Sequence, residues 1–390
     1  MKKIKVIHLI TKLELGGAQR NTIFTCENLD REKFEVYLMA GVGGILTPDI
    51  DKMKKGGNES EEKFIFVKDL IREINPGRDL KAYRYLKSEF KRIKPDIVHT
   101  HSSKAGIIGR IAAKRAGVPV VIHSVHGFSF SPFQPFLKRS IYRMIEKFVS
   151  RFTDHFIFVS EGDIVSAKKL KLMNRASFSL IRSGFDFKRF KNPGIGHVAA
   201  REKYNISKDD FVCGVIAPFK PQKGLIDLIR IASLVLERDK NIIFFIAGDG
   251  DLRGLIESKL KNAGIMDRFR MPGFINDIES VIPFFDIGVS TALWEGLPQS
   301  LVQLRLMKKA VVVTDIPGNN EIIKNNVNGH TVKVNNIKEF GDKILFLKNN
   351  SDNRNILASH KDDLDSWDGE VMVKSQEDLY FSLTESERFG

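Results

Sequence analysis

The chain has 390 residues, of which 42% are hydrophobic, and it carries 62 Lys and Arg against 48 Asp and Glu, a formal net charge of +14. This length indicates two to three domains with ordinary cores, and two widely separated cysteines exclude a disulfide framework or a zinc finger. The basic N-terminal stretch holds only a short apolar run, too short for a secretory signal or a membrane span, so we expect a cytoplasmic protein.

The positive charge is concentrated in the first half of the chain. Residues 1–195 contain 37 Lys and Arg against 20 Asp and Glu, whereas the remainder contains 25 against 28. Such asymmetry is typical of a domain that meets a polyanion, either nucleic acid or an anionic membrane surface. A lysine-rich soluble surface is the alternative.

Strand-like apolar runs alternate with helical patterns in both halves. In the first half the predicted strands span 4–10, 35–40, 63–67, 97–100, 118–124 and 155–159. In the second half they span 211–216, 242–247, 269–272, 286–290 and 310–314. Continuous apolar strands that alternate with helices are typical of parallel sheets covered on both faces. The sequence therefore predicts an α/β protein with two Rossmann-like, doubly wound domains.

The predicted domains are residues 1–190 and 209–370, joined by a linker over 191–208 that contains Pro193, Gly194 and Gly196. The last segment, 371–390, is predicted to form an amphipathic helix that packs back on the N-terminal domain. Ligands of open α/β sheets bind outside the carboxyl ends of the strands. Two facing domains would therefore line a cleft.

Three loops of the first half follow predicted strands. Gly16 and Gly17 open a helix after the first strand, where backbone can approach an anionic ligand closely, although a tight turn explains them equally well. His99 and His101 share a strand face without an apparent third metal ligand, so we expect hydrogen bonding rather than a metal. His126 ends a later strand, where its imidazole either meets a sugar hydroxyl or is satisfied within the fold.

A basic helix is predicted over 137–151, after an aromatic cluster at 128–136. Apolar Ile141, Ile145 and Phe148 fall on one side of it. The basic residues that flank this side are Lys138, Arg139, Arg143, Lys147 and Arg151. This pattern resembles a membrane-surface element, with ordinary solvated charges as the alternative.

In the second half, Lys220 and Lys223 lie on a strand-to-helix loop, where two lysines can pair with a diphosphate leaving group. Asp249 and Asp251 resemble an acidic metal motif. Because they directly precede a helix, Asp251 is better interpreted as its N-cap, and no metal-dependent catalysis is indicated.

The most informative stretch is 291–303, which joins a buried strand to a helix. Pro298 suits the first turn of that helix, so the N–H groups of Gln299, Ser300 and Leu301 are expected to be free and to attract phosphate. Glu295 lies just before this anion site. A carboxylate there is best explained by hydroxyl groups on the same ligand, and a sugar nucleotide is the simplest ligand that provides both.

Taken in order, these loops resemble those of the retaining glycosyltransferases of family 4, which have the GT-B fold of two facing Rossmann-like domains with an interdomain cleft. The resemblance covers essentially the whole chain. It is carried by Gly16-Gly17, His126-Gly127, Pro221-Gln-Lys223-Gly224, Ala247-Gly-Asp-Gly250, Trp294-Glu-Gly-Leu-Pro298 and Pro317-Gly-Asn-Asn-Glu321.

The resemblance implies a role for each matching residue. Glu295 would bind hydroxyls of the donor sugar, His126 would meet that sugar from the other domain, Lys223 would pair with the diphosphate, and backbone near Ile275 would read the base. The remaining residues expected at the donor site are Gly16, Gly17, Lys220, Gly296, Leu297, Gln299, Ser300, Leu301 and Gln303. The family implies a UDP-sugar donor, a lipid-linked or polysaccharide acceptor, and neither metal nor cofactor.

Two positions depart from the family pattern. The second glutamate of its paired signature, which grips the ribose hydroxyls, is Gln303 here, and this change removes the charge-assisted part of that contact, on the order of 1–2 kcal/mol. An arginine common five residues before the loop lysine is Pro218, and Lys220 offers a charge without a bidentate fork.

The sequence thus predicts a retaining, metal-independent glycosyltransferase at the inner face of the cytoplasmic membrane. It is expected to act on a lipid-linked, polysaccharide or lipopolysaccharide acceptor and to use Lys138, Arg139, Arg143 and Lys147 to contact the membrane or the acceptor. One alternative is a catalytically degenerate homologue that acts as a partner or regulatory subunit. Nucleic-acid binding is least favoured, because no recognisable nucleic-acid module is present.

Overall fold

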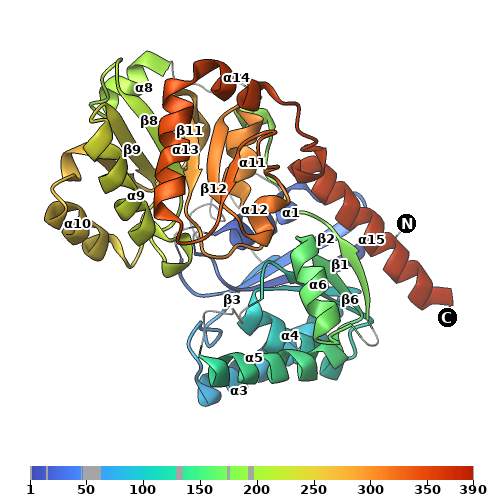
Figure 1. Cartoon of the computed structure of the whole chain (residues 1–390). Helices are drawn as coiled ribbons and strands as arrows, with labels where there is room; N and C mark the ends of the chain where they lie inside the picture. Colours follow the sequence, from blue (N-terminus) through green and yellow to red (C-terminus); the bar gives the residue numbers. More distant parts are fainter. Residues whose placement is uncertain are drawn as a thin grey trace. The chain divides into compact units, whose positions relative to one another are not determined.

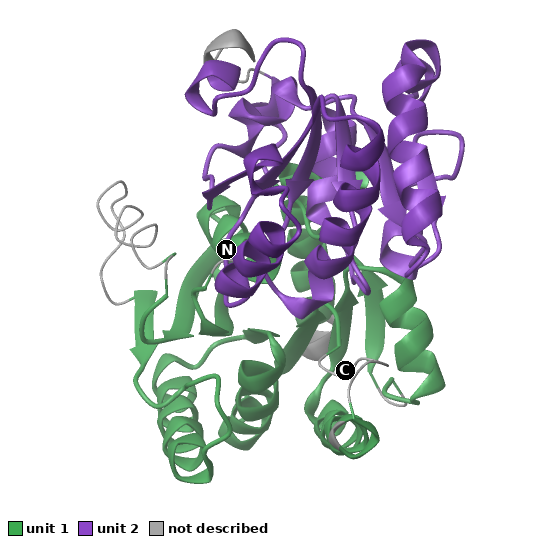
Figure 2. Cartoon of the chain, turned by 60° about the vertical axis from the view of Figure 1, so that its left-hand side comes forward, with its two compact units in different colours: residues 1–185, 365–390 green, residues 186–364 purple. Residues whose placement is uncertain are grey.

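The computed structural model describes residues 2–14, 16–44, 46, 63–128, 135–173, 176–191 and 197–389, and it divides into two compact units (Figures 1 and 2). Unit 1 comprises Met1–Phe185 together with Asp365–Gly390, and unit 2 comprises Asp186–Leu364. Each unit is a parallel sheet with helices on both faces, as the alternation of strands and helices predicts.

Unit 1 contains a seven-stranded parallel sheet in the order β3-β2-β1-β4-β5-β6-β7. Its strands are β1 Ile4–Lys12, β2 Phe34–Gly41, β3 Phe64–Val67, β4 Ile97–His101, β5 Val120–Val125, β6 His155–Phe158 and β7 Ser177–Leu180. The order reverses direction at β1 and β4, which is the switch point where ligands bind in such sheets.

The helices of unit 1 are arranged on both faces of this sheet. They are α1 Gly17–Asn28, α3 Pro76–Ile93, α4 Ser103–Ala116, α5 Phe136–Val149, α6 Glu161–Lys169 and α15 Gly369–Phe389, with short 3-10 turns at Ser150–Phe152 and Asp365–Trp367. Apolar residues of α3 and α4 pack on one face of the sheet, and those of α1 and α15 pack on the other. The C-terminal helix α15 is therefore part of the core of unit 1.

Unit 2 contains a six-stranded parallel sheet in the order β10-β9-β8-β11-β12-β13. Its strands are β8 Phe211–Ile216, β9 Ile242–Ala247, β10 Phe269–Gly273, β11 Ile287–Ser290, β12 Ala310–Thr314 and β13 His330–Val332. Its α-helices are α7 Lys188–Lys191, α8 His197–Lys203, α9 Leu225–Arg238, α10 Arg253–Asn262, α11 Gln299–Leu306, α12 Pro317–Asn320, α13 Ile337–Asn349 and α14 Ser351–Ser359. Its 3-10 turns are Pro221–Lys223, Met266–Arg268, Ile278–Ser280 and Ile282–Phe284.

The chain passes from unit 1 to unit 2 earlier than the predicted linker over 191–208. The boundary lies between Phe185 and Asp186, and part of the predicted linker is the helix α8. Arg201 of α8 is buried and donates to the carbonyl oxygens of Ser207 and Asp210, each at 2.6 Å. The buried side chain ties this segment to unit 2, a contact that the Pro and Gly content of the segment does not reveal.

None of the helices in the described part of the chain combines the length and the apolar character that a membrane-spanning helix requires. This includes α15, which has 21 residues and buries polar Gln376, Glu377 and Thr384 in unit 1 beside its apolar core residues.

Candidate active site

The carboxyl edge of the sheet in unit 2 brings together the loops that follow β8 and β11. Gly224 has a φ of +61°, and a Cβ there would lie 2.0 Å from the carbonyl oxygen of Thr291, so a side chain at this position would separate the loops. The Thr291 hydroxyl donates to the Lys223 carbonyl at 3.1 Å, and the Leu293 N–H donates to the Gln222 carbonyl at 2.8 Å. The two loops are thus held against each other by backbone as well as side chains.

The carboxylate of Glu295 is held by two residues of the β8 loop. Gln222 Nε2 donates to Glu295 Oε2 at 3.0 Å and to the carbonyl of Trp294 at 2.8 Å. Lys223 Nζ donates to the other carboxylate oxygen, Oε1. The side chains of Glu295 and Lys223 are only 7% and 16% exposed, so the pair is largely shielded from water and its charge-assisted hydrogen bonds are strong.

The start of α11 differs in detail from the expectation of three free N–H groups. Pro298 occupies the N-cap rather than the first turn. The Gln299 N–H donates to the Leu297 carbonyl at 3.1 Å, and the Leu301 N–H donates to the Pro298 carbonyl at 2.9 Å. Two of the three groups therefore have partners within the chain, because the backbone turns tightly before the helix begins, while the Ser300 N–H donates to no residue in the described ranges.

The loop around Glu295 is also fixed from its other side. A Cβ on Gly318 of α12 would lie 2.7 Å from the carbonyl oxygens of both Glu295 and Gly296. Glycine at this position lets the backbone of α12 lie directly on the loop, which explains one part of the Pro317–Glu321 motif.

Gln303 lies on α11 and is half-buried, and its amide forms no hydrogen bond with the residues that the structure describes. Its neighbour Arg305 is fully buried. The Arg305 guanidinium donates to Asp362 Oδ2 at 2.6 Å and to the Lys309 carbonyl at 2.7 Å. This pair fixes α11, and sequence reasoning missed it because its carboxylate comes from 57 residues away.

Two further residues of unit 2 that are predicted at the donor site, Ile275 and Lys220, also lie at this sheet edge. Ile275 is half-buried after β10, and Lys220 is half-buried at the N-cap of the 3-10 turn Pro221–Lys223. The prediction of Asp251 as an N-cap is wrong, since α10 begins one residue later, with Leu252 at its N-cap and no side-chain cap. Asp249 is the structural carboxylate here, because Arg253 Nε donates to it at 2.6 Å and this bond holds the Asp249 pKa below its usual range.

In unit 1 the predicted site residues Gly16, Gly17 and His126 follow β1 and β5, at the carboxyl edge of that sheet. Gly16 caps α1 in an extended conformation, and its carbonyl accepts from the Arg20 N–H at 3.1 Å. His126 is half-buried, and both of its ring nitrogens have partners in unit 1. Its Nε2 lies 3.3 Å from His101 Nδ1, and its Nδ1 lies 3.3 Å from Ser183 Oγ.

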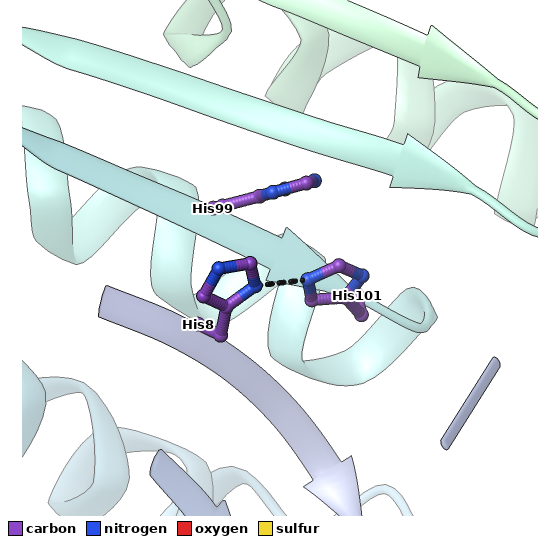
Figure 3. A group of neighbouring side chains, drawn as sticks. All are labelled: His8, His99 and His101. Carbon is purple, nitrogen blue, oxygen red and sulfur yellow. Dashed lines mark hydrogen bonds between the residues drawn. The ribbon is translucent and has the colours of Figure 1, made fainter. Parts of the chain in front are cut away.

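Beneath His126 lies a cluster of buried histidines, His8 of β1 and His99 and His101 of β4 (Figure 3). His8 Nδ1 lies 3.0 Å from His101 Nε2. The two nitrogens of His99 contact the hydroxyls of Tyr380 and Ser124 at 2.6 and 2.7 Å. The rings of His99 and His101 lie against each other, with centroids 4.2 Å apart. His8 is thus the third imidazole that the sequence did not reveal, and one ring nitrogen from each of the three histidines lies within 4.8 Å of the others, close enough to hold a metal ion. In the structure these nitrogens contact one another and the neighbouring hydroxyls.

Burial keeps these histidines neutral. It lowers the pKa of His8 to about 3 and that of His126 to about 4, and it lowers the pKa of His99 and His101 well below the usual value. Each ring therefore carries one proton at neutral pH, and each acts as one donor and one acceptor.

The helix α5 presents an apolar stripe to solvent. Its Glu146 accepts from the buried Arg110 of α4 at 2.8 Å and so fixes one side of α5 to unit 1. On another side, the exposed apolar residues follow helical spacing, which places them in one line. They are Leu137, Ile141, Met144 and Phe148, exposed by 72%, 42%, 66% and 53%.

The predicted cationic flank of α5 is only partly at the surface. Lys147 is exposed, but Arg139 and Arg143 are half-buried with buried Nε atoms, and the Arg139 guanidinium lies 5.8 Å from the centre of the Phe136 ring. The side chain of Lys138 lies outside the described residues. The apolar stripe, rather than an arginine row, is therefore the main surface feature of this helix.

Two family models match consecutive parts of the chain. Residues 15–189 match the model described as Glycosyltransferase Family 4, and residues 198–361 match that described as Glycosyl transferases group 1.

Curated relatives match over most of the chain. The UDP-Gal:alpha-D-GlcNAc-diphosphoundecaprenol alpha-1,3-galactosyltransferase of Escherichia coli is 32% identical over 87% of this chain and 86% of its own length. The N,N'-diacetylbacillosaminyl-diphospho-undecaprenol alpha-1,3-N-acetylgalactosaminyltransferase of Campylobacter jejuni is 26% identical over 79% of this chain and 82% of its own.

Solved structures share the fold at low identity. HepE of Anabaena, in complex with UDP and glucose, superposes with a TM-score of 0.81 and 17% identity, covering 97% of this chain and all of the other. WaaG, a glycosyltransferase involved in lipopolysaccharide biosynthesis, superposes with a TM-score of 0.71 and 16% identity, covering 98% of each chain.

We predict that unit 1 loses stability as the pH falls below about 6.5. Burial lowers the pKa of these histidines in the folded state, so the unfolded chain binds protons at a higher pH than the folded chain does. The stability is therefore complete above the pKa of the unfolded chain and is lost as the pH falls toward the pKa of the folded state. For a histidine with a folded pKa of about 4, this loss reaches about 2 kcal/mol at pH 5. Thermal unfolding followed by calorimetry at pH 7.5 and pH 5 measures it.

Two variants sharpen this test. His155→Asn removes a histidine whose pKa burial lowers to about 4 and should reduce the slope of stability against pH by about one proton. His360→Asn, at a half-exposed position of unit 2, serves as the matched control and should leave the transition of unit 1 unchanged. A transition of unit 1 that does not move between the two pH values contradicts the assignment of neutral buried histidines.

Proposed function

Because the chain belongs to family 4 of the glycosyltransferases, with the two Rossmann-like domains of the GT-B fold, we propose that it moves a sugar from a UDP-linked donor to a lipid-linked or polysaccharide acceptor. The reaction retains the anomeric configuration and requires no metal. The observation that carries this proposal is the Glu295 carboxylate held by Gln222 and Lys223 at the carboxyl edge of a parallel sheet, where ligands of such folds bind.

The donor binds to unit 2 in this proposal. Lys223 and Lys220 neutralise the diphosphate, the Ser300 N–H at the start of α11 donates to it, and Glu295 accepts from hydroxyls of the sugar. The complex of HepE with UDP and glucose supports a uridine nucleotide, and the backbone near Ile275 contacts the base. A lysine already in contact with Glu295 can bridge the carboxylate and a phosphate, so the sugar and the leaving group are positioned by one charge pair.

Transfer proceeds on one face of the sugar. The bond from C1 to the phosphate oxygen breaks while a bond from C1 to the acceptor oxygen forms on the same side, and the departing phosphate takes the proton of the acceptor hydroxyl. Lys223 and the start of α11 stabilise the negative charge that develops on the phosphate. The relatives from Escherichia coli and Campylobacter jejuni are named for α linkages, which supports retention because UDP-hexoses commonly carry an α-linked diphosphate.

The acceptor is proposed to be a glycan on a polyprenyl diphosphate or a related envelope polysaccharide. Both of these relatives are named for acceptors linked to diphosphoundecaprenol. An acceptor anchored in this way lies at the membrane surface, so the protein works there as a peripheral protein at the inner face of the cytoplasmic membrane. The apolar stripe of α5 and the basic surplus of residues 1–195 suit an anionic bilayer surface.

Glu295→Gln is expected to lower kcat/KM by at least about 100-fold, because the neutral amide has one acceptor oxygen instead of two and binds Lys223 and the sugar hydroxyls less strongly. Transfer from UDP-sugars to a polyprenyl-diphosphate-linked glycan measures it, and the thermal unfolding temperature shows that the fold is intact. Glu237→Gln, at an exposed position of α9, is the control with full activity. Turnover at the normal rate in Glu295→Gln would remove the central assignment.

Gln303→Glu is expected to tighten UDP binding about tenfold, since a carboxylate at this half-buried position adds a charge-assisted contact to the ribose hydroxyls. Isothermal titration with UDP measures the dissociation constant, and uridine, which keeps the ribose, should show the same gain. Unchanged or weaker binding of both ligands would place Gln303 away from the ribose.

The double substitution Leu137→Gln and Met144→Gln is expected to weaken binding to phosphatidylglycerol vesicles by 10-fold or more, because each buried Leu or Met side chain contributes about 1.5–3 kcal/mol. Co-sedimentation measures the partition coefficient. Ile356→Gln removes an apolar side chain of unit 2 that is 65% exposed and provides the control. Equal partition coefficients for the double variant and the unaltered protein would show that α5 does not contact the bilayer.

A further inference from the structure

We infer that Tyr380, His8 and His101 act as positioning residues that hold His126 in one tautomer, with its proton on Nε2 and an unprotonated Nδ1 that accepts a hydrogen bond from a hydroxyl of the donor sugar. This inference rests on the proposed function, and it adds the contact between His126 and the donor sugar that the family resemblance implies. It assigns a role to the buried side chains of Tyr380, His8 and His101. It also specifies that the sugar hydroxyl donates and that His126 Nδ1 accepts.

The direction of the hydrogen-bond chain is set at its inner end, on α15. Tyr380 OH lies 3.2 Å from Gln376 Oε1, and a carbonyl oxygen only accepts, so the tyrosine must donate to it. The orientation of the Gln376 amide follows from its Nε2, which faces the Thr25 hydroxyl at 3.5 Å. The single proton of the phenol is therefore committed to Gln376.

The tyrosine oxygen can then only accept from the two histidines next to it. His99 Nδ1 lies 2.6 Å from Tyr380 OH, and His8 Nε2 lies 3.5 Å from it. Both of these nitrogens must carry the proton of their ring, because an unprotonated nitrogen there would face an oxygen lone pair in a buried environment, which is costly. His99 Nε2 is then the acceptor for the Ser124 hydroxyl at 2.7 Å.

The remaining protons follow in sequence. Since each ring is neutral, His8 with a protonated Nε2 has an acceptor at Nδ1, and His101 Nε2 donates to it at 3.0 Å. His101 Nδ1 is then an acceptor, and His126 Nε2 donates to it at 3.3 Å. This leaves His126 Nδ1 unprotonated, and it accepts from Ser183 Oγ at 3.3 Å. Burial lowers the pKa of these rings, so each ring stays neutral and keeps one donor and one acceptor nitrogen.

The hydroxyl of Ser183 indicates what His126 is arranged to bind. A serine hydroxyl and a sugar hydroxyl are the same kind of donor, and the 3.3 Å contact is long enough to be exchanged at little cost. We therefore assign the Ser183 hydroxyl as the stand-in for a hydroxyl of the donor sugar, which takes its place at Nδ1 when the nucleotide sugar binds.

The chain can be tested without measuring catalysis. Protein labelled with 15N-histidine is examined by long-range 1H–15N correlation spectra, which distinguish a protonated from an unprotonated ring nitrogen. At neutral pH, His8, His101 and His126 should each show a protonated Nε2 and an unprotonated Nδ1. A protonated Nδ1 on His126 or His101 overturns the inference, whatever the protein binds.

Tyr380→Phe tests the origin of the order while keeping the aromatic ring in the core. Without the phenol, His8 Nε2 loses its acceptor, so His126 should change to the Nδ1-protonated form or to a mixture of both forms. Tyr85→Phe, at a position that is 43% exposed on α3, is the matched control and should leave the spectra unchanged. If Tyr380→Phe does not fold, Gln376→Met serves instead, because it frees the phenol proton for the histidines. Unchanged tautomers in the folded variant overturn the role of Tyr380.

The sugar contact is tested in the same samples. UDP-sugars that support turnover should shift the His126 Nδ1 resonance, whereas UDP alone should not, and the Tyr380→Phe variant should show a donor KM raised about tenfold with kcat little changed. If UDP binds and transfer occurs but His126 Nδ1 never responds to the sugar, the contact is refuted and the proposed function stands. If neither UDP nor any UDP-sugar binds, the proposed function and the sugar contact both fail, while the tautomer order is judged by the spectra of the free protein.

Discussion

The charge pair between Lys223 and Glu295 is the interaction on which the site in unit 2 depends. Lys223 ends the 3-10 turn Pro221–Lys223, and Glu295 lies on the loop after β11. The path of each segment is fixed by backbone contacts, the close approach of Gly224 to Thr291 on one side and of Gly318 to Glu295 on the other. Gln222 completes the arrangement by holding the second carboxylate oxygen. The pair is mostly shielded from water and held in place before any ligand binds. In the proposed donor complex, the partners of the phosphate and of the sugar hydroxyls would therefore need little ordering on binding.

Unit 1 follows a different principle, in which the polar groups are buried and neutral. Histidines are seldom placed in a core without partners, and here each ring nitrogen of the cluster faces another ring or a hydroxyl. The two ends of the network are unlike each other, since Tyr380 is fully buried and His126 is half-buried at the sheet edge. A network with one end in the core and the other at the carboxyl edge of the sheet gives the half-buried imidazole of His126 a defined orientation without giving it a charge.

The sequence predicts the sheets well because their strands are continuous apolar runs. The runs at 211–216, 242–247 and 310–314 have the same bounds as β8, β9 and β12. The strands that pattern reasoning missed are β7 and β13. The polar and apolar residues of β7 alternate over only four largely exposed positions, and β13 has three residues, so both are too short for a clear pattern. At the site, the contact between Glu295 and Lys223 was not predicted, and their expected roles toward a sugar and a diphosphate stay predictions. Gln222 was missed because an amide beside a lysine carries no pattern of its own, and the partners of His99 and His126 lie on distant elements that only tertiary packing brings together.

The docking of α15 into unit 1 has a consequence for how the protein forms on the ribosome. Residues 1–185 emerge with one face of their sheet covered by α1 alone, because Met372, Val373 and Tyr380 of α15, which complete that core, are translated only after residues 186–364. Until α15 is translated, this part of the core stays apolar and open to water, and the histidines beneath it lack the Tyr380 hydroxyl. A ribosome that stalls within residues 186–364 would therefore release a chain with that surface exposed to aggregation and to chaperones.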